Sequence, residues 1–146
     1  MILQHKTEIC VADGRKLLLL VNEGDTKFPD LQVIREEEQD LRPDRELSSD
    51  RPGRSVQSVG ARRSSYEETD FKQLAEDRFA ADVADILKKR ALAGKTDRLV
   101  VIAPPATLGE MRKHYHKEVV DRIVAEIAKE ATNLPPDAIA AMVEAA

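Results

Sequence analysis

Residues 51–66 form the stretch whose side chains are best suited to contact a polyanion. The stretch contains no Asp or Glu, although 34% of the whole chain is charged. The planar guanidinium group donates hydrogen bonds in a fork that fits phosphate oxygens, and glycines let a backbone approach a polyanion closely. The segment therefore predicts binding to RNA or to another phosphorylated partner, through Arg51, Arg54, Arg62 and Arg63.

A second interpretation of the same arginines is equally open. They can pair within the chain with the acidic run at 36–38 and with the acids at 67, 68 and 70. Arg112 and Lys113 can extend a basic surface if the first interpretation holds.

Other candidate chemistries find less support. A two-metal nuclease needs several carboxylates at converging strand ends. The apolar run 99–103 ends in Pro104 and Pro105 rather than in an acid, so Asp13 is interpreted as a turn residue. His114 and His116 supply only two metal ligands, and Cys10 lies in an apolar run typical of a buried thiol. Neither glycine-rich phosphate-binding fingerprint is present, so we predict no metal and no cofactor.

Composition limits the class of protein. The 146 residues are 42% hydrophobic, which is the composition of one soluble globular domain spanning the chain. A net charge of -4 excludes a wholly basic nucleic-acid coat. A single cysteine, no signal-peptide pattern and no apolar run near the ~20 residues of a membrane span predict a cytoplasmic protein with no membrane contact. The sequence does not specify an oligomeric state.

Three strands begin the expected fold. Runs 8–12 and 17–21 are joined by Asp13 and Gly14, which predicts a hairpin whose tight turn uses a positive φ at Gly14. The segment 31–37 predicts an outer third strand with alternating faces. Residues 39–69 show little periodicity and predict a long functional loop.

The second half predicts alternating helices and strands. Apolar residues at spacings of three and four predict a helix over 71–93, with Asp70 and Gln73 as a capping pair and Gly94 as a left-handed stop. A buried strand at 99–103 and a short helix that opens with a capping box at 107–110 and runs to Tyr115 follow. Residues 118–130 fit a helix or a strand, and the last helix is expected over 137–144.

The resulting order βββαβα(β)α predicts a ribonuclease-H-like α/β fold with a mixed sheet. The first three strands should be antiparallel, because a hairpin joins the first two. The strand at 99–103 should lie inside the sheet and parallel to the first, because a crossover helix precedes it.

Several separated motifs resemble a known bacterial family. The residues 11–14, 50–54, 58–63, 103–105 and 108–112 resemble those of the host-attachment proteins, described as required for attachment to host cells. That family is similar to the central, peptidyl-tRNA-hydrolysing domain of archaeo-eukaryotic release factors. The resemblance implies the same element order, with a mobile loop between the third strand and the long helix.

The resemblance also implies roles for single residues. The release-factor loop carries Gly-Gly-Gln, whose glutamine orients the hydrolytic water, followed by a serine and arginines. Gln57 and Ser58 match the end of that pattern and are assigned to catalysis and to RNA binding, whereas Ser55 and Val56 stand where both glycines belong. A β-branched residue resists the conformations that glycine allows.

Three functions follow as hypotheses. The leading one is a module that binds RNA, tRNA or the ribosome through the arginine-rich loop. The second is peptidyl-tRNA ester hydrolysis through Gln57. The third is a protein-interaction component of host attachment that works without nucleic acid.

Overall fold

The computed structural model describes the backbone of residues 1–39 and 61–146, and the side chains of residues 1–39 and 70–146. The α/β fold with a mixed sheet, expected from the order of elements, is confirmed. The described elements, in chain order, are β1 (Glu8–Ala12), β2 (Lys16–Asn22), β3 (Leu31–Glu38), α2 (Ala61–Leu92), β4 (Leu99–Ala103), α3 (Pro105–Arg112), α4 (Lys117–Val120), β5 (Ile123–Ala128) and α5 (Pro136–Glu144).

The five strands form one sheet in the order β3-β2-β1-β4-β5. The pairs β1–β2 and β2–β3 are antiparallel, whereas β4 pairs in parallel with both β1 and β5. These directions confirm the predicted hairpin and the predicted crossover. They also confirm that β3 is an outer strand and that β4 lies inside the sheet.

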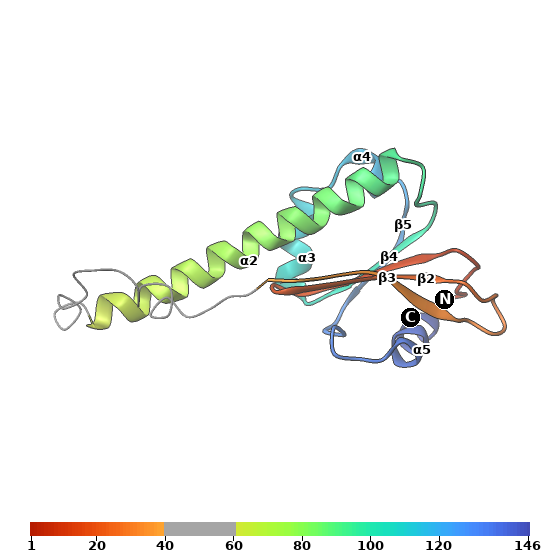
Figure 1. Cartoon of the computed structure of the whole chain (residues 1–146), viewed down its shortest axis with the longest axis horizontal. Helices are drawn as coiled ribbons and strands as arrows, with labels where there is room; N and C mark the ends of the chain where they lie inside the picture. Colours follow the sequence, from red (N-terminus) through yellow and green to blue (C-terminus); the bar gives the residue numbers. More distant parts are fainter. Residues whose placement is uncertain (40–60) are drawn as a thin grey trace.

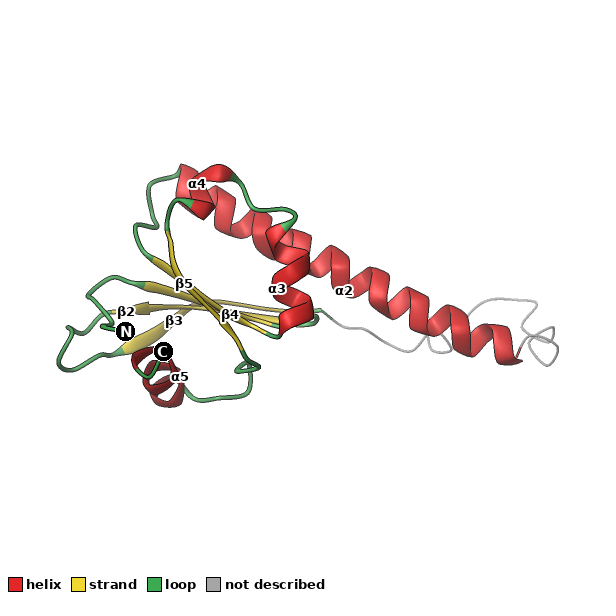
Figure 2. Ribbon diagram, turned by 180° about the vertical axis from the view of Figure 1, so that it is seen from behind, coloured by secondary structure: helices red, strands yellow, loops and turns green. Residues whose placement is uncertain are grey.

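Helices cover both faces of the sheet. The helices α2, α3 and α4 lie on one face and α5 lies on the other (Figures 1 and 2). Alternation along β1 divides its side chains between two cores, with Cys10 packed under α2 and Ile9 packed toward α5. Because successive side chains of a strand point to opposite faces, a fully apolar strand such as β4 serves both cores.

The start predicted for the long helix is wrong. The helix α2 begins at Ala61 rather than near Phe71, so Asp70 lies inside it and is not its cap. Residues 61–69, which were predicted to belong to the long loop, are therefore helical. The apolar spacing that marks a helix reflects the face that is covered by other elements, and the polar turns of 61–69 carry no such stripe. The predicted stop is confirmed, because Gly94 has a φ of 72°.

The hairpin forms where predicted, but its turn differs. Gly14 does not adopt a positive φ, so the predicted primed turn is wrong. The carboxylate of Asp13 accepts hydrogen bonds from the backbone N–H of Arg15 and of Lys16, both at 2.7 Å, and thereby closes the turn. Along β3 the expected alternation of faces breaks at a register shift opposite Leu19 and Leu20.

The elements after β4 also differ in detail. The helix α3 begins at Pro105, with Pro104 as its N-cap and no side-chain capping bond, so the predicted capping box at 107–110 is wrong. It ends at Arg112, short of Tyr115. The ambiguous segment 118–130 contains both alternatives, because the one-turn helix α4 precedes strand β5. The last helix α5 agrees with its prediction to within one residue.

In the part of the chain that the structure describes, no helix is both long and apolar enough to cross a membrane.

Candidate functional site

Gln39, the last residue that the structure describes before the arginine-rich stretch, is held at a defined point. Gln39 donates from its backbone N–H to the carbonyl of Arg15 at 2.7 Å and from its Nε2 to the carbonyl of Ala75 at 3.2 Å. These two bonds join the end of β3, the hairpin turn and helix α2. Gln39 therefore lies beside Ala75, and Ala61, the first residue described after 40–60, begins α2.

Helix α2 runs well past the sheet. From Ala75 onward, one face of the helix packs on the sheet, and Phe79 and Leu87 on that face are only 7% and 2% exposed. One turn earlier, Phe71 and Leu74 are 39% and 52% exposed. Figure 1 shows the helix projecting beyond the strands toward its N-terminal end. At 1.5 Å per residue, Ala61 lies about 21 Å along the axis from Ala75.

Two of the arginines that the sequence placed in one long loop lie instead in a helix. Arg51, Arg54, Gln57 and Ser58 lie outside the described residues. Arg62 and Arg63 belong to the first turn of α2, so their expected placement in the loop is wrong at the level of the backbone. The sequence missed this because a solvated helix turn has no apolar periodicity.

Arg112 and Lys113 lie at the C-terminal end of α3, beside the packed part of α2. Arg112 contacts the carboxylate of Glu126 at 3.2 Å, and Lys113 contacts that of Glu110 at 2.9 Å. The hydrogen bond that Lys113 donates to Glu110 raises the pKa of Lys113 and lowers the pKa of Glu110. Both cations are therefore ion-paired, and the structure does not bring them next to the first turn of α2.

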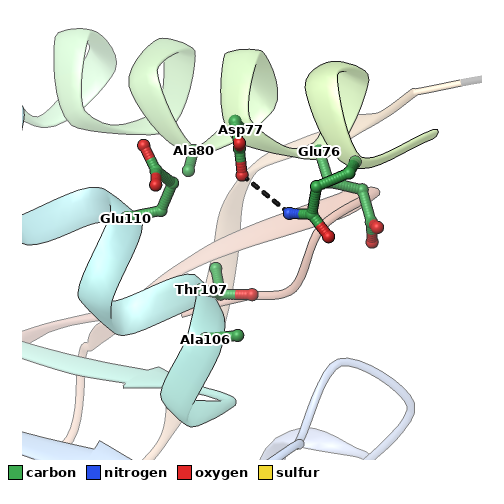
Figure 3. Close-up of a pocket in the computed structure, with 7 residues that line it drawn as sticks. Glu76, Asp77, Ala80, Ala106, Thr107 and Glu110 are labelled. Carbon is green, nitrogen blue, oxygen red and sulfur yellow. Dashed lines mark hydrogen bonds between the residues drawn. The ribbon is translucent and has the colours of Figure 1, made fainter. Parts of the chain in front are cut away.

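An acidic hollow lies between α2 and α3 (Figure 3). It has a volume of about 80 Å³, and its carboxylates come from both helices. Asp77 accepts a hydrogen bond from Gln73 at 2.9 Å, and Glu110 is engaged by Lys113. No group of three or more His, Cys, Asp or Glu side chains suited to a metal ion occurs among the described residues. Sequence reasoning missed this hollow, since residues of two helices meet there only through packing.

Asp13 has a structural role in addition to closing the hairpin. Its second carboxylate oxygen accepts a hydrogen bond at 2.8 Å from the hydroxyl of Thr132, which is only 2% exposed. The side chain therefore ties the hairpin to the connection between β5 and α5. Its position agrees with the interpretation as a turn residue.

The remaining candidate side chains are also accounted for. The Nδ1 of His116 accepts the backbone N–H of Glu118 and caps α4, which occupies that nitrogen. His114 lies 3.5 Å from the carboxylate of Glu110. Cys10 is fully buried, and burial raises the pKa of its thiol to about 12, so it is not a nucleophile in the folded protein.

The comparisons with known proteins concern nearly the whole chain. Nine chains of solved structures match it, and one is an archaeal translation termination factor, aRF1. That similarity has a TM-score of 0.48 at 13% identity, and it covers 94% of this chain but only 39% of the termination factor. No curated protein matches the sequence. Residues 6–143 match the family described as bacterial archaeo-eukaryotic release factor family 12. The chain therefore belongs to the bacterial archaeo-eukaryotic release factor family 12.

Proposed function

We propose that the protein is a translation-related RNA-binding module that presents residues 51–63 to tRNA or to ribosomal RNA. Family membership supports a role connected with translation. The observation that carries the proposal is the projection of α2, whose first turn contains Arg62 and Arg63 about 21 Å beyond the last packed turn. A helix that projects from a rigid sheet suits contact with an RNA backbone inside a larger particle.

The chemistry assigned to the segment is phosphate binding. Arg51, Arg54, Arg62 and Arg63 donate to phosphate oxygens, and the hydroxyl of Ser58 adds a neutral donor. Each phosphate that an arginine neutralises releases condensed counterions, so binding weakens as salt rises.

The acids that could compete for these arginines are partly occupied. Glu37 contacts Arg35 at 2.9 Å, and Glu36 lies 3.7 Å from Lys16. These pairs lower the net negative charge near Gln39, where the described part of β3 leads toward the segment.

Arg112 and Lys113 have a secondary place in this proposal. Both cations are exposed although each pairs with a carboxylate. Exposed ion pairs contribute little to stability, so replacing the carboxylate by a phosphate as the partner costs little free energy. They would contact RNA that lies over α3 rather than RNA at the first turn of α2.

Titration with ribosomes and with tRNA over a range of salt tests the proposal. Contact with three or four phosphates predicts a slope of log affinity against log salt of roughly -2 to -4. Replacing Arg54, Arg62 and Arg63 together by Ala should flatten the slope by roughly 2 to 3.

The matched control removes the same charge elsewhere. Arg15, Arg78 and Arg98 are exposed, and their combined replacement by Ala should leave the slope much closer to that of the unmodified protein. Absence of binding at low salt, or equal effects of the two triple variants, would refute the proposal and favour a protein partner, as in the host-attachment hypothesis.

Peptidyl-tRNA ester hydrolysis is a second candidate, because the description of the family names release factors. Gln57 would orient the attacking water. Replacing Gln57 by Ala should then abolish release of the peptide while leaving the affinity for ribosomes unchanged. Replacing Ser55 and Val56 by Gly should increase release, because both glycines of the release-factor pattern would be restored. Equal release by the unmodified protein and the Gln57→Ala variant would exclude this activity.

A further inference from the structure

A basic hollow lies at the end of α2 opposite to its projecting first turn. It is formed between the edge strand β3 and the last turns of α2, and it has a volume of about 210 Å³. Four of its six lining residues are cationic and none is acidic. The lining residues are Arg35, Ile86, Lys89, Arg90, Ala93 and Lys95.

The ending of α2 brings two of these cations together. Gly94 adopts a φ of 72°, and its N–H bonds to the carbonyl of Ala91 at 3.0 Å. The N–H of Lys95 reaches back to the carbonyl of Arg90 at 3.0 Å. This pair of bonds is the Schellman motif, in which the chain reverses over the last turn of a helix. It fixes the backbone of Lys95 beside that of Arg90 and satisfies two carbonyls at the negative end of the helix.

The guanidinium of Arg90 is held in place from the other side. Its Nε and Nη2 each donate at 3.0 Å to a different oxygen of Glu8, which is 2% exposed. The hydroxyl of Thr96 donates to the same carboxylate at 3.1 Å. This bidentate pair fixes the plane of the guanidinium, and Nη1 has no hydrogen bond to the described residues. An arginine oriented in this way can donate to a second acceptor with little loss of side-chain entropy.

The other three cations are available to a ligand. Arg35 pairs with Glu37 at 2.9 Å and Lys89 pairs with Asp85 at 3.0 Å, but both pairs are exposed, and neither carboxylate lines the hollow. Exposed pairs of this kind are weak and readily exchanged. Lys95 is exposed, and it has no carboxylate partner within the part of the chain that the structure describes.

We infer that this hollow binds a phosphate group of an RNA backbone. Four cations line the hollow and outweigh the negative end of the helix dipole. Arg35 can offer its guanidinium fork to phosphate oxygens, and Arg90 can add its Nη1. The assignment of RNA rests on the function proposed above. Arg62 and Arg90 are separated by 28 helical residues, about 42 Å along the axis, so one large RNA would contact both ends of α2.

The anion site is tested first with inorganic phosphate. Titration followed by amide chemical shifts should move the signals of Ala93, Gly94 and Lys95 in a saturable way. The double variant Lys89→Ala/Lys95→Ala should lose this response. Both lysines are exposed, so the variant should keep the melting temperature of the unmodified protein. The proposal is wrong if phosphate causes no saturable shifts in the folded protein, or if the double variant responds equally.

The RNA assignment is tested with tRNA and ribosomes. Loss of one or two phosphate contacts should weaken binding roughly three- to tenfold at 0.1 M salt and reduce the salt slope by roughly 1 to 2. Lys27→Ala/Lys129→Ala, which removes two exposed lysines outside the hollow, is the control for loss of charge. Unchanged RNA binding by the double variant would overturn the inference, even if inorganic phosphate binds.

The same titrations separate this inference from the proposed function. In one outcome the triple arginine variant binds RNA normally and the double lysine variant does not. Residues 51–63 are then not an RNA-binding site, whereas the hollow is. The reverse result overturns the hollow alone. A protein that binds no RNA at low salt overturns both.

Discussion

Two leucines on α2 provide a direct test of which face of this helix packs on the sheet. Leu87 is 2% exposed and packs in the core with the residues of β1, β2 and β4, whereas Leu74 is 52% exposed. Replacing either by Ala removes the same atoms from the same helix. The helix propensities of the two changes therefore cancel in the comparison, and only burial differs.

The expected magnitudes follow from the two environments. Leu→Ala removes about three methylene equivalents at about 0.8 kcal/mol each, so Leu87→Ala loses roughly 2.4 kcal/mol of transfer free energy. The cavity left between α2 and the sheet adds to this, and we expect a total loss of about 3 to 4 kcal/mol. Leu74→Ala should cost less than about 1 kcal/mol, because half of its side chain already contacts solvent.

Urea unfolding followed by circular dichroism at 222 nm measures both losses. A domain of this size has an unfolding free energy of about 5–15 kcal/mol, so a loss of about 3 kcal/mol should lower the midpoint clearly at an unchanged m value. The control is the equality of the native spectra of the two variants. Similar losses for Leu74→Ala and Leu87→Ala would refute the claim that Leu74 lies on the solvent-exposed face of α2. A loss under about 1 kcal/mol for Leu87→Ala would refute the packing of α2 on the sheet.

Three further predictions concern single side chains. Arg90→Ala should cost about 3–5 kcal/mol in urea unfolding, because it leaves the carboxylate of Glu8 buried without its partner, and adding Glu8→Gln should recover part of the loss. Burial raises the pKa of Cys10 to about 12, so the folded state binds more protons than the unfolded state above about pH 9 and stability should fall with rising pH. Between pH 8 and pH 10 the unfolding free energy should fall by about 1.4 kcal/mol more than it does in Cys10→Ala, and an equal fall would contradict the burial of the thiol. Gly24→Ala should cost roughly 1–3 kcal/mol, because its new Cβ would meet backbone atoms, whereas Gly14→Ala should cost less than about 1 kcal/mol, because there the Cβ meets a flexible side chain; thermal melts compare the two, and the opposite ranking would be contrary to the structure.

The sheet was readable from local sequence signals. The runs at β1, β2 and β4 are continuous and apolar, and Asp13 with Gly14 between the first two implies their antiparallel pairing. The long apolar spacing before β4 implies a crossover helix and hence a parallel strand. Gly94 marks the end of α2, because a positive φ favours a residue without a Cβ.

The start of α2 was not readable in the same way. Hydrophobic spacing reports which residues of a helix are covered, and the sequence of 61–69 has no apolar residues at spacings of three and four. Asp70 therefore fits the pattern of an N-cap, because the apolar spacing begins at the next residue, Phe71. The helix in fact starts nine residues before Asp70, at Ala61. The same reasoning explains why 118–130 fitted two patterns, because α4 and β5 share one short apolar stretch.

The sequence by itself determined the class of fold, the strand directions, the burial of Cys10 and the stretch of arginines without acids, because each of these depends on residues close together in the chain. Only the tertiary structure decided which distant charges meet. Arg35 and Lys95 come to line one hollow, and Asp77 and Glu110 come to line another, through the packing of β3, α2 and α3. Such convergence depends on the register and crossing of whole elements, and no local spacing of residues encodes it.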